Sequence, residues 1–253
     1  MREWIVGRNP IFEVLQAQKR QSYQLQVAKG AILKGRLAHI IQICESRKIP
    51  IRRVSNEKVD AKGHGHQGVA IEVNGYPYCT IYDILERIEE DVQPAFLLIL
   101  DTLQDPQNLG TLLRTADVTG VQGVILPLRR SATVTPAVVR ASSGATEHLN
   151  IAQANLAQTI VYLKQKGIWI IGLEHSPKAK KPQEIAFSIP LAFVVGSEGQ
   201  GMRNLTRKSC DMFLRLPMRG HVDSLNASVA GSIALYLAWE QRNFEGESAV
   251  NMS

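Results

Sequence analysis

Four short apolar runs in the second half of the sequence constrain the fold more than any other feature. They are AFLLILD (95–101), GVQGVIL (120–126), GIWIIGL (167–173) and LAFVVG (191–196), and helical stretches separate them. A strand that is apolar at nearly every position is typical of a parallel sheet with helices on both faces, because a half-exposed strand alternates. We therefore predict an α/β domain with a parallel sheet over residues 94–253.

The first 75 residues predict a smaller α/β domain. They suggest a helix capped by Asn9 with Pro10 at its first position, a strand at 23–29, a helix over 34–47, a strand at 49–55, and a strand after the Gly/His-rich turn that begins at residue 61. An acidic helix at 81–92 lies between Pro77 and Pro94. We predict domains at 1–75 and 94–253, joined by a linker or bridging helix at 76–93.

The charge is divided unequally between these parts. Residues 1–75 hold 13 Lys and Arg against 6 Asp and Glu, a net charge of +7, whereas the rest hold 16 against 17, a net charge of −1. A basic module beside a near-neutral one suggests contact with a polyanion, although a solubilising surface would look the same.

Other features narrow the class of protein. Three widely spaced cysteines, Cys44, Cys79 and Cys210, are typical of reduced thiols in a cytoplasmic protein. No apolar run approaches the roughly 18 residues of a membrane-spanning helix, and the segment MREWIVGRNP lacks a secretory h-region. His64 and His66 have no Cys or carboxylate cluster nearby, so we expect a glycine-rich turn and no metal.

The loop after the first run leads into a helix. Asp105 caps it, Pro106 opens it, and its apolar stripe is Leu109, Leu112, Leu113 and Ala116. Asn108 lies in its first turn, and Arg114 falls roughly opposite the stripe, where a solvated arginine is the ordinary interpretation.

The loop GSEGQGM (196–202) follows the last apolar run. Its glycines allow a ligand to approach the backbone closely, but it is neither a dinucleotide fingerprint nor a P-loop, which makes a nicotinamide dehydrogenase remote. Glu198 would repel a phosphate, so a neutral or positively charged ligand fits better. A plain turn with an exposed Glu198 is the alternative.

The segment RGHVDSLNASVA (219–230) opens the last helix. Ser224 or Asn226 could cap this helix, but one cap does not require several small polar residues in succession. The helix repeats small residues at Ala227, Ala230, Gly231, Ala234 and Ala238. They allow close packing of another helix, either within the subunit or across a dimer.

Three motifs in this order resemble those of the SpoU/TrmH family of RNA ribose 2′-O-methyltransferases, in the SPOUT class: DPQNLGTLLRTAD, VVGSEGQGM and LRLPMRGHVDSLNASVA. IVGRNPIFEVLQ and GHQGVAIEV resemble the family's N-terminal RNA-binding domain, and VRASSGATEHLNI resembles its bacterial 23S rRNA guanosine members. The resemblance implies a deep trefoil knot in the C-terminal domain, a homodimer, S-adenosylmethionine as methyl donor, and no metal.

The resemblance also assigns residues. The catalytic set is Asn108, Arg114, Glu198, Ser224 and Asn226, with Asn108 orienting Arg114 and Glu198 fixing the arginine or the nucleotide. The cofactor would be held at Gly196, Gly201, Leu216, Met218, Leu225 and Ala227. Arg114 would act either as a base or by stabilising developing alkoxide charge; a literal base is hard to accept, because arginine stays protonated in proteins. The candidates for RNA phosphates come instead from the positive charge of residues 1–75: Arg2, Arg8, Lys34, Arg36, Arg52 and Arg53.

The substrate stays open between two kinds of RNA. SSGATEHL (142–149) favours a guanosine of 23S rRNA over tRNA, and a non-catalytic RNA-binding assembly factor is the alternative from another class.

Overall fold

The computed structural model describes residues 2–129, 132–221 and 224–247, and its contacts group them into two compact units. The N-terminal unit contains residues up to Pro77 together with 109–114 and 133–148. The C-terminal unit contains 78–108, 115–129, residue 132 and the described residues from 149 onward. The grouping of 133–148 with the N-terminal residues was not predicted from the sequence.

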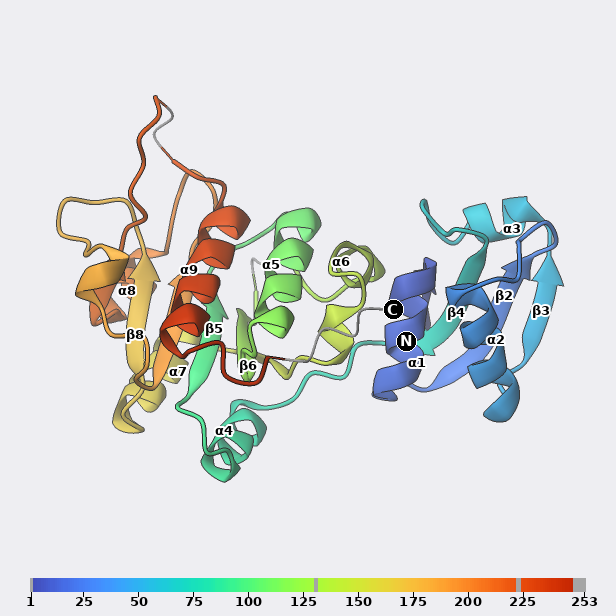
Figure 1. Ribbon diagram of the computed structural model, residues 1–253, viewed down its shortest axis with the longest axis horizontal. Coiled ribbons are helices and arrows are strands. Elements are labelled where there is room, and N and C mark those ends of the chain that lie inside the picture. The colour runs from blue at the N-terminus through green and yellow to red at the C-terminus, as the bar shows by residue number, and fades with distance from the viewer. Residues whose placement is uncertain (1, 130–131, 222–223, 248–253) are drawn as a thin grey trace. The chain divides into compact units, whose positions relative to one another are not determined.

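The N-terminal unit has a four-stranded sheet in the order β1-β4-β2-β3 (Figure 1). Its elements are β1 (Arg2–Val6), α1 (Arg8–Ala17), β2 (Ser22–Ala28), α2 (Arg36–Ser46), β3 (Ile51–Val54), α3 (Asn56–Asp60) and β4 (Val69–Asn74), with α6 (Pro136–Ala141) and the 3₁₀ turn η1 (Ala145–Glu147). The predicted cap of α1 is wrong. Gly7 is the N-cap, with φ +97°, and Asn9 lies inside the first turn, because the left-handed side of φ space suits glycine.

The C-terminal unit is built on a six-stranded sheet in the order β10-β8-β9-β5-β6-β7, and every pair is parallel. The strands are β5 (Phe96–Leu100), β6 (Gly123–Pro127), β7 (Ile151–Ala154), β8 (Trp169–Leu173), β9 (Leu191–Val195) and β10 (Met212–Leu214). The helices are α4 (Ile81–Glu90), α7 (Leu156–Gln165), α8 (Asn204–Ser209) and α9 (Ala227–Gln241), with the 3₁₀ turn η2 (Pro182–Glu184). The two ends of α5 (Pro106–Val118) also belong here, whereas its residues 109–114 group with the N-terminal unit. The predicted parallel sheet is confirmed.

Helices cover both faces of this sheet. On one face, Leu97 and Ile99 of β5 pack in a core cluster with Ile84 of α4 and Ile160 of α7. Successive residues of a strand point to opposite faces, and Phe96 accordingly contacts Phe193 and the guanidinium of Arg242, the residue that ends α9. Every residue of β5, β6 and β9 is buried, which explains why these runs are apolar at nearly every position, whereas Trp169 at the start of β8 is exposed.

Two helices near the site have strong start signals. Asp105 accepts hydrogen bonds from the backbone of Gln107 and Asn108 at the start of α5, with Pro106 in the first turn, as predicted. The acidic helix predicted between the domains is α4. Thr80 and Asp83 form a capping box there, and Ile84 and Leu85 are buried in the C-terminal unit's core.

Side by side with α5 lies α9, and the hydroxyls of Thr115 and Ser232 are 2.9 Å apart (Figure 1). Gly231, Ala234 and Ala238 are buried within this chain. Of the two alternatives for the small residues, close packing within the subunit therefore applies to these three. None of the helices within the described ranges combines the length and the hydropathy that crossing a bilayer requires.

Candidate functional site

A cavity of about 710 Å³ opens where β8, β9 and β10 end. Its walls come from the segments that follow these three strands and from the first turn of α9. Ligands of open parallel sheets bind at the carboxyl ends of the strands, and the volume lies in the range of roughly 300–1,000 Å³ that is typical of small-molecule sites. All six residues predicted to hold a cofactor line this cavity: Gly196, Gly201, Leu216, Met218, Leu225 and Ala227.

The wall after β9 is a closed loop that requires glycine. Ser197 and Gly201 exchange two backbone hydrogen bonds, of 3.1 and 3.0 Å, so the loop turns back on itself. Gly199 and Gly201 have φ of +78° and +65°, which favours glycine. A Cβ on Gly196 would lie 2.3 Å from the carbonyl carbon of Gly201, so the chain can cross here only without a side chain.

A buried carboxylate fixes the end of this loop. Asp101 follows β5, is fully buried, and accepts hydrogen bonds from the backbone N–H of Arg203 at 2.8 Å and from its Nε at 2.6 Å. Sequence reasoning missed this contact. The available signal was an acidic residue directly after a continuous apolar run, since a buried charge needs a partner.

Asn108, Glu198 and Asn226 come together from three distant segments. The amide of Asn108 donates to Glu198 Oε1 at 3.1 Å, and the amide of Asn226 donates to the same oxygen and to Asn108 Oδ1 at 3.0 Å. Ser228 Oγ donates to Asn108 Oδ1 at 3.1 Å. Glu198 therefore ties the loop after β9 to α5 and to the start of α9.

Asn226 is also the N-cap of α9. Its Oδ1 accepts hydrogen bonds from the backbone N–H groups of Ser228 and Val229, while its Nδ2 serves Glu198 and Asn108. The amide oxygen of Asn226 thus caps α9, while its amide nitrogen bonds Glu198 and Asn108. A serine has no second group for these contacts, which explains why asparagine suits this position better. Ser224 is exposed on the cavity wall. Val222 and Asp223 of the third motif lie outside the described residues.

Arg114 is exposed on α5, as predicted from the helical rotation. Its Nη1 donates to the hydroxyl of Ser143 at 3.2 Å. The side-chain amide of Asn108, which was predicted to orient Arg114, forms its hydrogen bonds with Glu198, Asn226 and Ser228. The roles assigned to Asn108 and Glu198 toward Arg114 stay predictions. Ser143 was not predicted.

An ion pair stands at the cavity wall beside β8. Arg207 donates to both carboxylate oxygens of Glu174, and these hydrogen bonds hold the pKa of Glu174 below its ordinary value. Both residues line the cavity with His175. Glu174 therefore stays ionised there at neutral pH, and it is a second acidic group beside Glu198 that sequence reasoning did not identify.

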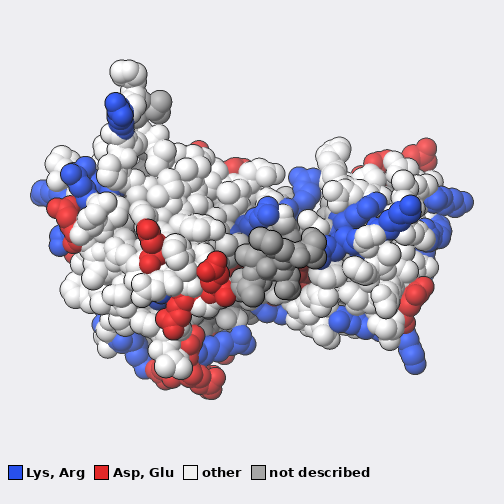
Figure 2. Space-filling model, in the orientation of Figure 1, with Lys and Arg blue, Asp and Glu red and all other residues white. Residues whose placement is uncertain are grey.

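The six basic residues predicted to bind RNA lie in the N-terminal unit: Arg2, Arg8, Lys34, Arg36, Arg52 and Arg53. All are exposed except Arg8, which is half-buried and whose Nε donates to the carbonyl of Gln67 at 3.3 Å. Figure 2 shows Lys and Arg groups around α2, α3 and β3, with fewer acidic groups. Arg52 and Arg53 are on β3, the edge strand of the sheet.

His66 of the glycine-rich turn has structural partners. His66 Nε2 lies 2.7 Å from Asp60 Oδ1, and its Nδ1 accepts from the backbone of Gly68 at 2.9 Å. Both ring nitrogens are thus engaged in holding the turn. Across the part of the chain that the structure describes, no group of three or more His, Cys, Asp and Glu could hold a metal ion.

Solved structures share this architecture. The SpoU methyltransferase AviRb from Streptomyces viridochromogenes, solved in complex with AdoMet, matches with a TM-score of 0.79 at 21% identity, covering 96% of this chain and 91% of that one. A structure described as RNA 2′-O ribose methyltransferase matches with a TM-score of 0.77 at 26% identity, covering 96% and 89%. The fold is therefore that of the SPOUT methyltransferases. The knot stays a prediction.

Comparisons of the sequence point to the same group of methyltransferases as the solved structures. YacO of Bacillus subtilis (strain 168), whose name places it in the TrmH family of tRNA/rRNA methyltransferases, is 39% identical over 247 residues, covering 97% of this chain and 98% of the relative. Residues 4–79 match the model of the RNA 2′-O ribose methyltransferase substrate-binding domain. Residues 95–236, more than half of the chain, match the SpoU rRNA methylase model. This chain belongs to the SpoU rRNA methylase family.

Proposed function

We propose that this protein transfers the methyl group of S-adenosylmethionine to the 2′-hydroxyl of a ribose in RNA. The observation that carries the proposal is the convergence of the cavity-lining residues. The six predicted cofactor residues come from three short segments, 196–201, 216–218 and 225–227, and line one cavity. The same segments carry Glu198 and Asn226, which are bonded to Asn108.

The cavity suits the donor in shape and charge. Gly201 has no side chain, and a Cβ there would meet no atom within 4 Å, so an adenine or a ribose can lie against its peptide groups. Glu174 is paired with Arg207, and Glu198 at the wall suits a ligand with positive charge on sulfur and nitrogen better than a polyphosphate. The donor supplies the activated methyl group. The chain must bind it, exclude water and place the ribose oxygen in line.

Arg114 would receive the developing negative charge of the ribose oxygen. Its guanidinium stays protonated, so electrostatic stabilisation of the alkoxide is the role that its chemistry supports most directly. Its exposure on α5 leaves N–H groups for RNA beyond the one that Ser143 accepts.

RNA would be held by the basic N-terminal unit, and we propose a guanosine of 23S rRNA as the target, with tRNA as the second candidate. The SSGATEHL segment favours rRNA, and the names of the relatives include both RNAs. The family resemblance supports a homodimer. We place the activity in the cytoplasm, where the widely spaced thiols of Cys44, Cys79 and Cys210 would stay reduced.

The test uses S-adenosylmethionine with a labelled methyl group and the purified chain. We expect label in 23S rRNA, recovered as a 2′-O-methylnucleoside, and none with Arg114→Ala, whose affinity for S-adenosylmethionine stays within about twofold of wild type. Near-normal turnover by Arg114→Ala would remove this residue from the mechanism. Label in tRNA alone would establish the second candidate, and RNA binding without transfer would favour the assembly factor.

A further inference from the structure

Ser143 occupies a backbone position that ordinarily belongs to glycine. It follows α6 with φ +56°, in the left-handed region. The backbone N–H of Ser143 donates to Arg140 O at 3.0 Å, and that of Gly144 donates to Val139 O at 2.8 Å. This pair of hydrogen bonds is the Schellman motif, in which the left-handed residue is usually glycine because a Cβ is sterically disfavoured there.

The side chain of Ser143 therefore needs a reason to be present. Glycine would form the same two backbone hydrogen bonds without the steric cost. What glycine lacks is the hydroxyl, and this hydroxyl accepts a hydrogen bond from Arg114 Nη1 at 3.2 Å. The sequence thus keeps, at some cost in stability, a group that contacts the predicted catalytic arginine.

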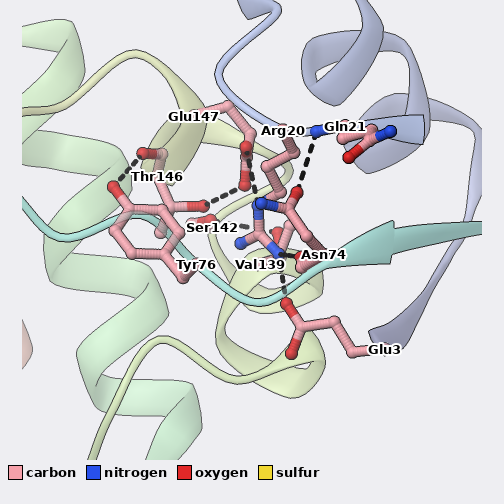
Figure 3. A network of polar contacts seen from close by, with 9 residues as sticks. All are labelled: Glu3, Arg20, Gln21, Asn74, Tyr76, Val139, Ser142, Thr146 and Glu147. Carbon is pink, nitrogen blue, oxygen red and sulfur yellow. Dashed lines mark hydrogen bonds and ion pairs between the residues drawn. The ribbon is translucent and has the colours of Figure 1, made fainter. Parts of the chain in front are cut away.

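The segment that carries Ser143 is firmly held. Arg20 Nε donates to Glu147 Oε2 at 3.0 Å, with both side chains fully buried, and Arg20 also pairs with Glu3 (Figure 3). Tyr76 donates from its hydroxyl to the carbonyl of Thr146 at 2.7 Å (Figure 3). These contacts attach Thr146 and Glu147, which follow Ser143 by three and four residues, to Arg20 and Tyr76, and they restrain the segment that carries the hydroxyl.

The close packing of α1 against Gly144 also restrains the turn that carries Ser143. Gly144 has φ +94°, and a Cβ there would lie 2.6 Å from the Cβ of Glu13. Glu13 in turn lies 3.0 Å from His148 Nε2. Gly144, directly after Ser143, is thus packed against α1, which restrains the backbone of the turn that carries the hydroxyl.

We propose that Ser143 is a positioning residue that orients the guanidinium of Arg114 for methyl transfer. An arginine side chain has many rotamers, and ordering it costs entropy at the moment of reaction unless a partner has already restricted it. One N–H directed at a fixed hydroxyl limits the plane of the guanidinium and leaves its other donors for the ribose and phosphate of the RNA. This inference rests on the proposed function.

The test compares Ser143→Gly, Ser143→Ala and Ser143→Asn. Glycine relieves the backbone, so Ser143→Gly should melt at or above the wild-type temperature, which excludes misfolding as a cause of lost activity. Its kcat should fall about five- to tenfold, the effect of one lost hydrogen bond, with KM for RNA and affinity for S-adenosylmethionine within about twofold of wild type. Ser143→Ala should lose kcat equally. Ser143→Asn tolerates the backbone and carries an acceptor oxygen, so it should recover most of kcat.

A readout independent of activity separates this inference from the proposed function. In NMR spectra of the arginine side chains, rotation about the Cζ–Nη bonds of Arg114 should be slowed in wild type and free in Ser143→Gly. Absence of methyl transfer by the wild-type chain would refute the proposed function. The NMR measurement would still show whether Ser143 restrains the guanidinium of Arg114. Wild-type kcat in Ser143→Gly, or unchanged Arg114 rotation, would overturn the inference.

Discussion

Replacing Gly196 by alanine should displace the loop after β9 and so distort the cavity that this loop lines. The new Cβ would lie 2.3 Å from the carbonyl carbon of Gly201 and 2.4 Å from the nitrogen of Met202. Carbon atoms in contact are ordinarily about 3.5–4.0 Å apart, so the loop or the end of β9 must move by about 1 Å or more. The loop is restrained, because Arg203 directly after Met202 is bound to buried Asp101.

The energetic cost can be estimated from this overlap. Overpacking by one methyl group in a close-packed site costs about 1–3 kcal/mol. If relaxation distorts the cavity rather than β9, the same energy appears as weaker binding, and at 1.4 kcal/mol per factor of ten it corresponds to about a 5- to 150-fold rise in the Kd for S-adenosylmethionine. Any part that falls on β9 appears as a lower melting temperature.

Isothermal titration with S-adenosylmethionine and a thermal melt measure the two parts. Gly30→Ala is the matched control, because a Cβ at Gly30 meets no atom within 4 Å and its φ is not in the left-handed region. It should leave both quantities unchanged. If Gly196→Ala binds the donor with wild-type affinity and melts as wild type, the close approach at Gly196 does not shape the binding site and the reasoning fails.

Three further predictions address other parts of the molecule. Asn226→Ala removes the α9 cap and should lower stability by about 1 kcal/mol, whereas Asn226→Asp keeps the cap but places a second carboxylate against Glu198. Thermal melts should show the larger loss of stability in Asn226→Ala, and transfer assays should show lower activity in both variants. Normal activity in Asn226→Asp would count against the role of the cluster formed by Asn108, Glu198 and Asn226. Burial raises the pKa of Glu147 above its ordinary 4.5, so the folded chain binds more protons and its stability falls as pH rises from 4.5 through that pKa. Relative to Glu147→Gln, the melting temperature of wild type should therefore rise as the pH is lowered toward 4.5. A difference in melting temperature that does not change with pH would contradict this. Replacing Arg52 and Arg53 with Gln should reduce the slope of log affinity for RNA against log salt by about 0.7–0.9 for each phosphate that these arginines neutralise, and an unchanged slope would mean that β3 does not meet RNA.

The parallel sheet was predictable because burial on both faces leaves a direct signal. Its strands β5, β6, β8 and β9 are four continuous apolar runs. The two outer strands, β7 and β10, were missed because they are short, at Ile151–Ala154 and Met212–Leu214. They also lie at the two edges of the sheet, where fewer apolar residues are needed. The cap of α1 was misplaced because Asn9 and Pro10 are strong start signals, while a glycine cap has no side chain to recognise.

The site was predictable where motifs determine backbone shape. Gly196 and Asn226 were singled out because bare backbone and a helix cap have recognisable residue types. The contacts of Asp101 with Arg203 and of Ser143 with Arg114 were missed because each joins residues remote in sequence through a single side chain. The buried pair of Arg20 and Glu147 is of the same kind, since it joins residues 127 positions apart.

A crystal structure with S-adenosylhomocysteine bound is the most direct test of the central claim, that the loops after β9 and β10 and the start of α9 hold the methyl donor. We expect electron density for the adenosine against the backbone near Gly196, Leu216 and Leu225, with the sulfur directed toward the side of the cavity where Glu198 and Asn226 lie. Density elsewhere on the chain, with this cavity occupied only by water, would contradict the account.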